Sequence, residues 1–235
     1  MLRQIVLDTE TTGIETRDGN RIIEIGCVEI IDRKMTGHNY HQYIQPDRES
    51  EEGALAVHGI TSEFLADKPR FHEIVKDFID YVKGAELIIH NAPFDIGFID
   101  YELGLLNDGW GSITDICTVI DSLEMAREMH PGQRNSLDAL CKRYDINNAH
   151  RELHGALLDS EILGDVYLAM TGGQVALSLD DQPVPIVDND GQEEAGGFHL
   201  PTEGLRVIKA SEDELAAHAA RMEVIAKASG KTLWQ

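Results

Sequence analysis

Two carboxylates stand at alternate positions near the start of the chain. They are Asp8 and Glu10, in the segment Ile5-Val6-Leu7-Asp8-Thr9-Glu10-Thr11-Thr12-Gly13. An apolar, β-branched run that ends at a turn signal predicts a buried strand, which directs both carboxylates to one face. Carboxylates that close repel each other, and Mg²⁺ or Mn²⁺ relieves the repulsion; a pair of such ions ~3.5–4 Å apart commonly hydrolyses phosphodiesters. Taken alone, the pattern is also compatible with a solvated strand end.

A third carboxylate, Asp95, belongs to the segment His90-Asn91-Ala92-Pro93-Phe94-Asp95. A short apolar strand ends there, and Pro93 suits the first turn of a helix. Asp95 then lies in that first turn, at the carboxyl end of a strand, where open α/β sheets place their sites. The alternative is that Asp95 only complements the dipole of the helix.

A histidine and a fourth carboxylate occur together in His154-Gly155-Ala156-Leu157-Leu158-Asp159. Five residues of an α-helix turn through ~500°, so His154 and Asp159 do not share a face if both are helical. We therefore expect His154 in the turn before the helix and Asp159 inside the helix, facing the sheet. His154 alone is more typical of a surface histidine, whereas an aspartate among apolar residues is uncommon unless it is paired or binds metal.

The elements that must position these groups follow from the apolar spacing. A hairpin of two strands is expected after the first strand, and strands and helices then alternate, which predicts an α/β protein with a mixed five-stranded sheet flanked by helices. The further strands are expected over 21–31, 39–44, 87–90 and 113–117, and the helices over 71–82, 93–103, 119–129, 136–144 and 155–170.

The composition restricts the class of protein. The net charge of −22 is the opposite of what a protein needs to hold nucleic acid by neutralising phosphates, so affinity for DNA or RNA must come from metal ions, local contacts or tethering. Three scattered cysteines without a C-x-x-C pair argue against structural zinc and suit a reducing compartment. No run of ~18 apolar residues and no signal sequence is present, so we expect a cytoplasmic protein without a membrane segment.

The pattern changes after residue 173. The stretch from Asp180 to Glu203 is rich in proline, glycine and acid and has no lysine or arginine, which predicts a flexible linker. We expect a main domain over 1–175, a linker over 176–203 and a small C-terminal segment over 204–235. This segment is expected to hold a strand over 205–208 and a helix over 211–228, with a capping box of Ser211 and Glu214. The apolar stripe of the helix needs another surface, which is either the main domain or a second protein; it comprises Leu215, Ala219, Met222, Ile225 and Ala226.

The three carboxylate-bearing segments, in this order, resemble the three motifs of the histidine-bearing DEDD exonucleases over about residues 3–173. The resemblance implies a ribonuclease H-like fold and a 3′–5′ exonuclease that releases nucleoside 5′-monophosphates. It also implies two divalent ions, Mg²⁺ or Mn²⁺, and His154 as the base that takes a proton from water. The residues implied to hold the ions are Asp8, Glu10, Asp95 and Asp159, and those implied to contact the terminal nucleotide are Thr9, Glu10, Val57, His58, Phe94 and Asp159.

Three further segments, 134–141, 153–159 and 167–173, resemble the proofreading subunits of bacterial DNA polymerase III. This resemblance implies removal of mismatched nucleotides from a DNA 3′ end and binding of the catalytic (alpha) subunit through 204–235. It implies the sliding clamp as a further partner, through Gln174, Leu177 and Leu179. Some relatives also carry a small accessory (theta-like) subunit.

One position departs from that family, which often has a glutamate before the Val57-His58-Gly59 segment. Gly53 stands there, with Glu52 beside it. Two other functions remain open from the sequence. One is an RNA-trimming exoribonuclease of the same superfamily, and the other is a non-catalytic adapter between polymerase and clamp.

Overall fold

The computed structural model describes residues 2–148, 153–172, 186–187, 193–194 and 210–229. The chain divides into two compact units, Met1–Val175 and Ala176–Gln235. Within the described ranges, no helix combines the length and the apolar character that crossing a membrane requires.

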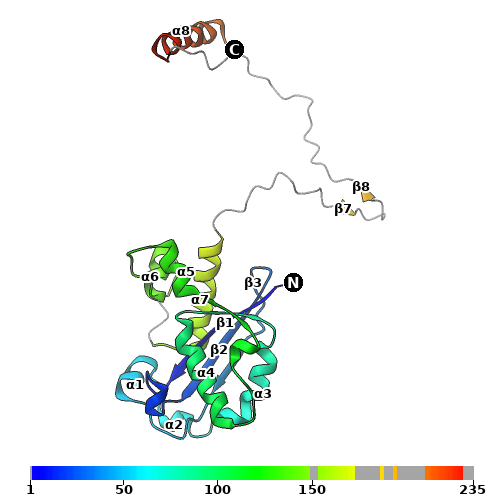
Figure 1. Cartoon of the computed structure of the whole chain (residues 1–235), viewed down its shortest axis with the longest axis vertical. Coiled ribbons are helices and arrows are strands. Elements are labelled where there is room, and N and C mark those ends of the chain that lie inside the picture. The colour runs from blue at the N-terminus through cyan, green and yellow to red at the C-terminus, as the bar shows by residue number, and fades with distance from the viewer. Residues whose placement is uncertain (1, 149–152, 173–185, 188–192, 195–209, 230–235) are drawn as a thin grey trace. The chain divides into compact units, whose positions relative to one another are not determined.

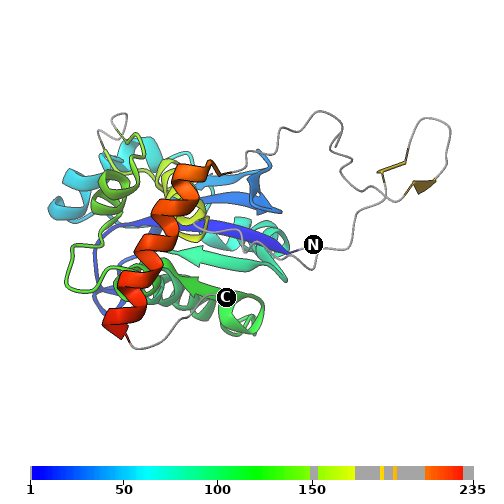
Figure 2. The ribbon, with the colours of Figure 1, turned by 90° about the horizontal axis from the view of Figure 1, so that it is seen from above.

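A mixed sheet forms the centre of the first unit, and six strands of the described chain take part in it (Figures 1 and 2). The order is β3-β2-β1-β5-β6, and β4 also pairs with β2. The central strand β1 runs antiparallel to β2 and parallel to β5, and β6 continues the parallel half. The strands are β1 (Arg3–Thr11), β2 (Ile22–Ile31), β3 (Lys34–Met35), β4 (Tyr40–Tyr43), β5 (Glu86–Ile89) and β6 (Thr118–Asp121).

Helices cover both faces of this sheet, so that two apolar layers enclose β1. The buried side chains of α3 and α4 pack on one face against Ile5 and Leu7. On the other face α7 packs against Val6 and β2, with α5 and α6 behind it. The helices of the unit are α1 (Glu52–His58), α2 (Ser62–Leu65), α3 (Phe71–Val82), α4 (Ala92–Leu106), α5 (Ser122–Met129), α6 (Leu137–Tyr144) and α7 (Ala156–Thr171), with 3-10 turns η1 (Thr16–Asp18) and η2 (Ile113–Asp115).

Most of the expected elements are confirmed, and α3 shows why. Its apolar residues recur at helical spacing and are all buried, and the carboxylate of Glu73 accepts the backbone N–H of Arg70 at 2.7 Å, which satisfies an end of the helix. The hairpin is confirmed by the antiparallel pairing of β2 with β4. The sheet has one strand more than the five expected, because β3 lies in the link between those two strands.

Two expectations about the middle of the chain are wrong. The strand expected over 113–117 is a 3-10 turn, because Ser112 and Asp115 cap each other's backbone N–H groups there. The strand is instead β6, and the helix expected from residue 119 begins only at Ser122. It cannot begin earlier because the carboxylate of Asp121 accepts the N–H groups of Leu123 and Glu124 as the N-cap.

The second unit is described only in part. The helix expected over 211–228 is confirmed as α8 (Glu212–Ser229). Its capping box is present, since Ser211 N–H donates to Glu214 Oε2 at 2.8 Å and Glu214 N–H donates to Ser211 Oγ at 3.3 Å. Two short strands that we did not expect, β7 (Ile186–Val187) and β8 (Glu193–Glu194), pair antiparallel. The strand expected over 205–208 and most of the expected linker lie outside the described residues.

Candidate metal and nuclease site

The end of β1 forms the floor of a cavity of about 740 Å³. Asp8, Thr9 and Glu10 all line it, at the point where β1 leaves its regular pairing with β2 through a bulge after Glu10. Four of the five expected chemical groups meet in this cavity, because His154 and Asp159 line it as well. They come from two segments separated by more than a hundred residues of sequence.

The helix α7 brings Asp159 to the sheet through a close approach to β2. Gly26 on β2 pairs with Asp8 on β1, and a Cβ at Gly26 would lie 2.2 Å from the backbone of Ala156 and Leu157. Only glycine leaves room for the first turn of α7 at this place. The hydroxyl of Ser160 donates to the Gly26 carbonyl at 2.9 Å and fixes the contact.

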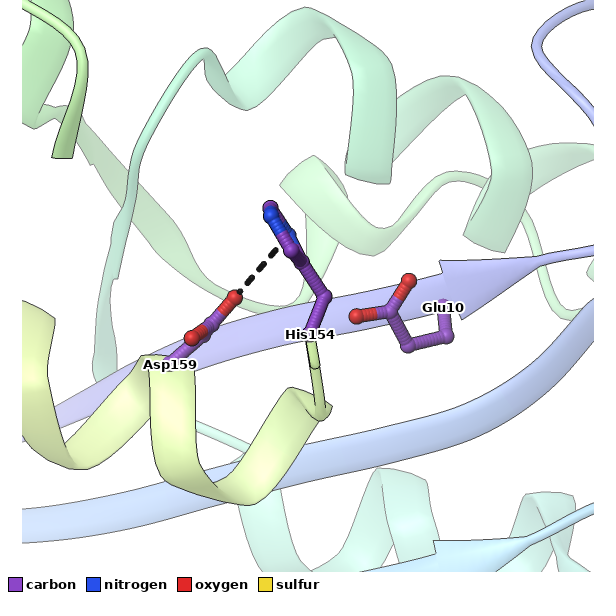
Figure 3. Close-up of side chains that lie close together, drawn as sticks. All are labelled: Glu10, His154 and Asp159. Carbon is purple, nitrogen blue, oxygen red and sulfur yellow. Dashed lines mark ion pairs between the residues drawn. The ribbon is translucent and has the colours of Figure 1, made fainter. Parts of the chain in front are cut away.

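His154 precedes α7 and Asp159 lies inside it, as expected from their spacing (Figure 3). His154 Nδ1 lies 3.4 Å from Asp159 Oδ2, and the side chains are 44% and 4% exposed, respectively. Figure 3 also shows the Glu10 carboxylate beside the imidazole. One ligand atom from each of Glu10, His154 and Asp159 lies within 4.8 Å of the others.

Asp95 reaches the same end of β1 from the opposite face of the sheet. It lies in the first turn of α4, is 3% exposed, and accepts the hydroxyl of Thr9 at 2.6 Å through Oδ1. Burial raises the pKa of Asp95 to about 7, although the hydrogen bond from Thr9 opposes the rise. Asp95 is not among the residues that line the cavity, so the structure places it behind Thr9 rather than in the open site.

The site suits hard divalent ions on the chemistry of its donors. Buried carboxylates on neighbouring elements are costly unless something positive compensates them, and the raised pKa of Asp95 is one expression of that cost. Carboxylate oxygens are the ligands that Mg²⁺ and Mn²⁺ prefer. Asp8, Glu10 and Asp159, which line the cavity, therefore form a donor set that fits such ions, and Asp95 lies beside it through its hydrogen bond with Thr9.

A second cavity of about 300 Å³ adjoins the first and shares Glu10 and Phe94 with it. Val57 and His58 line this cavity. The His58 ring is 4% exposed and its Nδ1 accepts the backbone N–H of Ile60 at 2.9 Å. Burial lowers the pKa of His58, so the ring is held neutral with its proton on Nε2.

The departure from the resembled family lies at this second cavity. Gly53 lines it, and a Cβ added at Gly53 would meet nothing within 4 Å. Glu52 does not line the cavity, but Glu51 does. Its Oε1 accepts a hydrogen bond from Asn20 Nδ2 at 2.7 Å.

Several polar residues that no sequence motif predicted also line the larger cavity. Arg127 lies in α5, and three more lie between α5 and α6, namely Gln133, Asn135 and Ser136. Such side chains commonly contact the sugar–phosphate backbone of nucleic acids. No residue pattern marks them, because a polar loop has this composition whether or not it faces a site.

Asp121 is a second residue that the motifs did not reveal. Its carboxylate accepts the N–H groups of Asn91 and Ala92 at 3.2 and 3.1 Å, and so holds the start of α4, which carries Asp95. Its place at the end of a strand is the signal that could have identified it. The expected clamp-binding residues Gln174, Leu177 and Leu179 lie outside the described residues.

Comparisons with known proteins agree with this geometry. The model of the exonuclease family (RNase_T) matches residues 5–167. DNA polymerase III subunit epsilon of Salmonella typhimurium is 51% identical over 242 residues, and that of Escherichia coli (strain K12) is 49% identical over 242 residues; each alignment covers 99% of this chain and 97% of the relative. The structure of exonuclease X in complex with 5′ overhanging duplex DNA matches with a TM-score of 0.53 and 27% identity, over 72% of this chain and 91% of that one. The chain therefore belongs to the exonuclease family and, within it, to the family of DNA polymerase III epsilon subunits.

Proposed function

We propose that the chain is the proofreading 3′–5′ exonuclease of a replicative DNA polymerase and removes mismatched nucleotides from a DNA 3′ end. The observation that carries the proposal is the convergence of Asp8, Glu10, His154 and Asp159 on one cavity, in a chain of the epsilon-subunit family. The products are nucleoside 5′-monophosphates.

Four carboxylates would hold two Mg²⁺ or Mn²⁺ ions, namely Asp8, Glu10, Asp95 and Asp159. When bound, such a pair lowers the pKa of water and stabilises negative charge on the oxygens of the scissile phosphate. The chain's own contribution is the fixed placement of the ligands. Asp8 and Glu10 are fixed by the pairing of β1, Asp95 by Thr9, and Asp159 by the seating of α7.

His154 is the group that takes the proton from the attacking water. Asp159, 3.4 Å from Nδ1, orients the ring and stabilises the positive charge that the ring acquires. Because His154 is 44% exposed, its proton can pass to solvent after each turnover. His154→Ala should lower kcat by ~10²–10⁴-fold while metal binding remains, and an unchanged kcat would remove His154 from the mechanism.

The terminal nucleotide would lie between the two cavities. Thr9, Glu10 and Asp159 are near its phosphate and sugar, and Val57, His58 and Phe94 hold its base by apolar and stacking contacts. Contacts of this kind carry little sequence preference. A mismatched end unpairs at lower cost than a matched one, and this difference gives proofreading its selectivity.

The rest of the chain would attach the nuclease to its polymerase. We propose a main domain over 1–175, a linker over 176–203 and a segment over 204–235 that binds the catalytic (alpha) subunit. The apolar side chains Leu215 and Ile225 of α8 are 58% and 42% exposed, which supports a partner surface there. Binding of the sliding clamp through Gln174, Leu177 and Leu179, a theta-like subunit, and cytoplasmic localisation are further parts of the proposal.

The net charge of −22 agrees with a nuclease that acts only when tethered. Free in solution, such a chain is repelled by DNA, whereas a suitable linker to the polymerase raises its effective concentration at the DNA end to ~mM.

The test is release of mononucleotides from single-stranded DNA by the full chain, with Mg²⁺, with Mn²⁺ and with a chelator. The proposal expects metal-dependent release that starts at the 3′ end and is lost in Asp159→Ala. Faster degradation of RNA than of DNA would favour the exoribonuclease, and no release under any condition would favour the adapter.

A further inference from the structure

The turn that carries His154 is attached to the end of α1. The backbone N–H of His154 donates to the carbonyl of Val57 at 3.1 Å. The last carbonyls of a helix have no partner within that helix, so the end of α1 offers an acceptor that the His154 turn satisfies. The attachment holds the backbone of His154, while Asp159 contacts its ring.

A side-chain contact accompanies this hydrogen bond. The chain leaves α1 at Gly59, whose φ of +69° suits glycine. A Cβ at Gly59 would lie 2.6 Å from Leu153 Cδ1, so the leucine occupies the space that the missing side chain leaves. Leu153 is nevertheless 52% exposed, so it is not a core residue.

The segment that receives the His154 turn also lines the smaller cavity. Val57 and His58 face that cavity, while the Val57 carbonyl and Gly59 hold His154 and Leu153. The wall proposed to hold the terminal nucleobase and the anchor of the proposed catalytic histidine therefore lie in one segment, Val57 to Gly59, and share Val57. Figure 3 shows why the anchor matters, because the His154 side chain projects from a segment outside α7.

We propose that Leu153 is a positioning residue for His154 and that its contact with Gly59 keeps the imidazole oriented toward Asp159 and Glu10. The inference rests on the proposed role of His154 and assigns to Leu153 no contact with substrate. Leu153 acts on the rate only through the histidine beside it, and the affinity for DNA does not depend on it.

A double-mutant cycle in the full chain tests this role. Leu153→Ala and His154→Ala are made singly and together, with Leu153→Met as the conservative variant. Leu105→Ala is the matched control, because Leu105 is 45% exposed and lies at the far end of α4. The measurements are kcat and KM for release of nucleotides from single-stranded DNA with Mn²⁺.

Leu153→Ala is expected to lower kcat about tenfold with KM within about twofold, since a small displacement of a catalytic group is enough for such a loss. Leu153→Met restores most of the rate, and Leu105→Ala matches the parent. In the His154→Ala background, Leu153→Ala changes the remaining rate by less than about twofold, because residues that act as one unit are not additive.

Three results would overturn the inference. They are an unchanged kcat in Leu153→Ala, a rise of KM alone, and the same tenfold loss in the His154→Ala background. A His154→Ala variant with parental kcat would overturn the proposed base as well, and so separates the two failures.

Discussion

Replacing Asp95 with asparagine should change the stability of the metal-free protein in a pH-dependent way, with the balance moving in favour of the variant as the pH rises. Burial raises the pKa of Asp95 from 3.8 to about 7. Between these values the folded chain binds a proton that the unfolded chain lacks, so the group lowers the free energy of unfolding as the pH rises. A rise from pH 5 to pH 8 crosses about two pH units of this range. The free energy of unfolding should therefore fall by roughly 2–3 kcal/mol.

Asparagine does not titrate, so the variant escapes this loss. The difference in unfolding free energy between Asp95→Asn and the parent should therefore grow by roughly 2–3 kcal/mol from pH 5 to pH 8. A constant offset of ~1–3 kcal/mol against the variant is expected at every pH, because its amide meets backbone N–H groups that the carboxylate accepts. The growth with pH, not the absolute difference, is the quantity predicted.

Urea denaturation of the full chain in chelator, at pH 5, 6, 7 and 8, measures this difference. Asp80→Asn is the control, because Asp80 is exposed and the neighbouring Lys76 lowers its pKa, so its replacement cannot give a gain that grows with pH. Added Mn²⁺ at pH 8 should stabilise the parent more than the variant. A difference that stays constant or shrinks from pH 5 to pH 8 would refute the reasoning about buried charge at the site.

Three further predictions concern the seating of α7, the C-terminal segment and the acidic surface. Gly26→Ala should lower kcat by ~100-fold and lower the melting temperature, because its Cβ displaces the first turn of α7. Gly104→Ala should do neither, because a Cβ there meets nothing within 4 Å. Equal effects of the two substitutions in nuclease assays and thermal scans would contradict this. Truncation after Gly173 should keep hydrolysis but abolish association with the polymerase subunit in size-exclusion chromatography, and loss of hydrolysis would show that the tail is needed for the site. Affinity for DNA should fall with salt with a log–log slope no steeper than about −2, and a steep loss between low and moderate salt, measured by fluorescence anisotropy, would count against the tethered nuclease.

Local patterns made most of the fold predictable. The alternating acids on β1, the proline at the start of α4 and the apolar spacing of α3 each depend on a few neighbouring residues, and the structure confirms these elements. The turn before α7 was predictable for the same reason, because His154 and Asp159 could not share one face if both were part of the helix.

Other elements depend on tertiary contacts that no short pattern reveals. Most side chains of α1 are exposed, so the helix has no apolar stripe by which to recognise it. The apolar residues around Ile113 favoured a strand, but the mutual capping of Ser112 and Asp115 turns the chain before β6 can begin. The spacing of apolar residues does not show whether such a cap or a strand is the more stable structure.

The site follows the same division. Its carboxylates could be singled out in the sequence because three short segments carry them, and the order of those segments resembles a known set of motifs. The close approach at Gly26 was not predictable, because it depends on a helix 130 residues further along the chain. The position of Asp95 was not predictable either, because it depends on a hydrogen bond between Thr9 on β1 and a helix 86 residues further along the chain.

Titration of the metal-free full chain with Mn²⁺, followed by the paramagnetic resonance of the free ion, measures whether the four carboxylates bind divalent ions. We expect two ions per chain in the presence of a nucleoside 5′-monophosphate, and loss of at least one ion in each alanine variant of Asp8, Glu10, Asp95 and Asp159. Unchanged binding in all four variants would show that these carboxylates do not form a divalent-metal site.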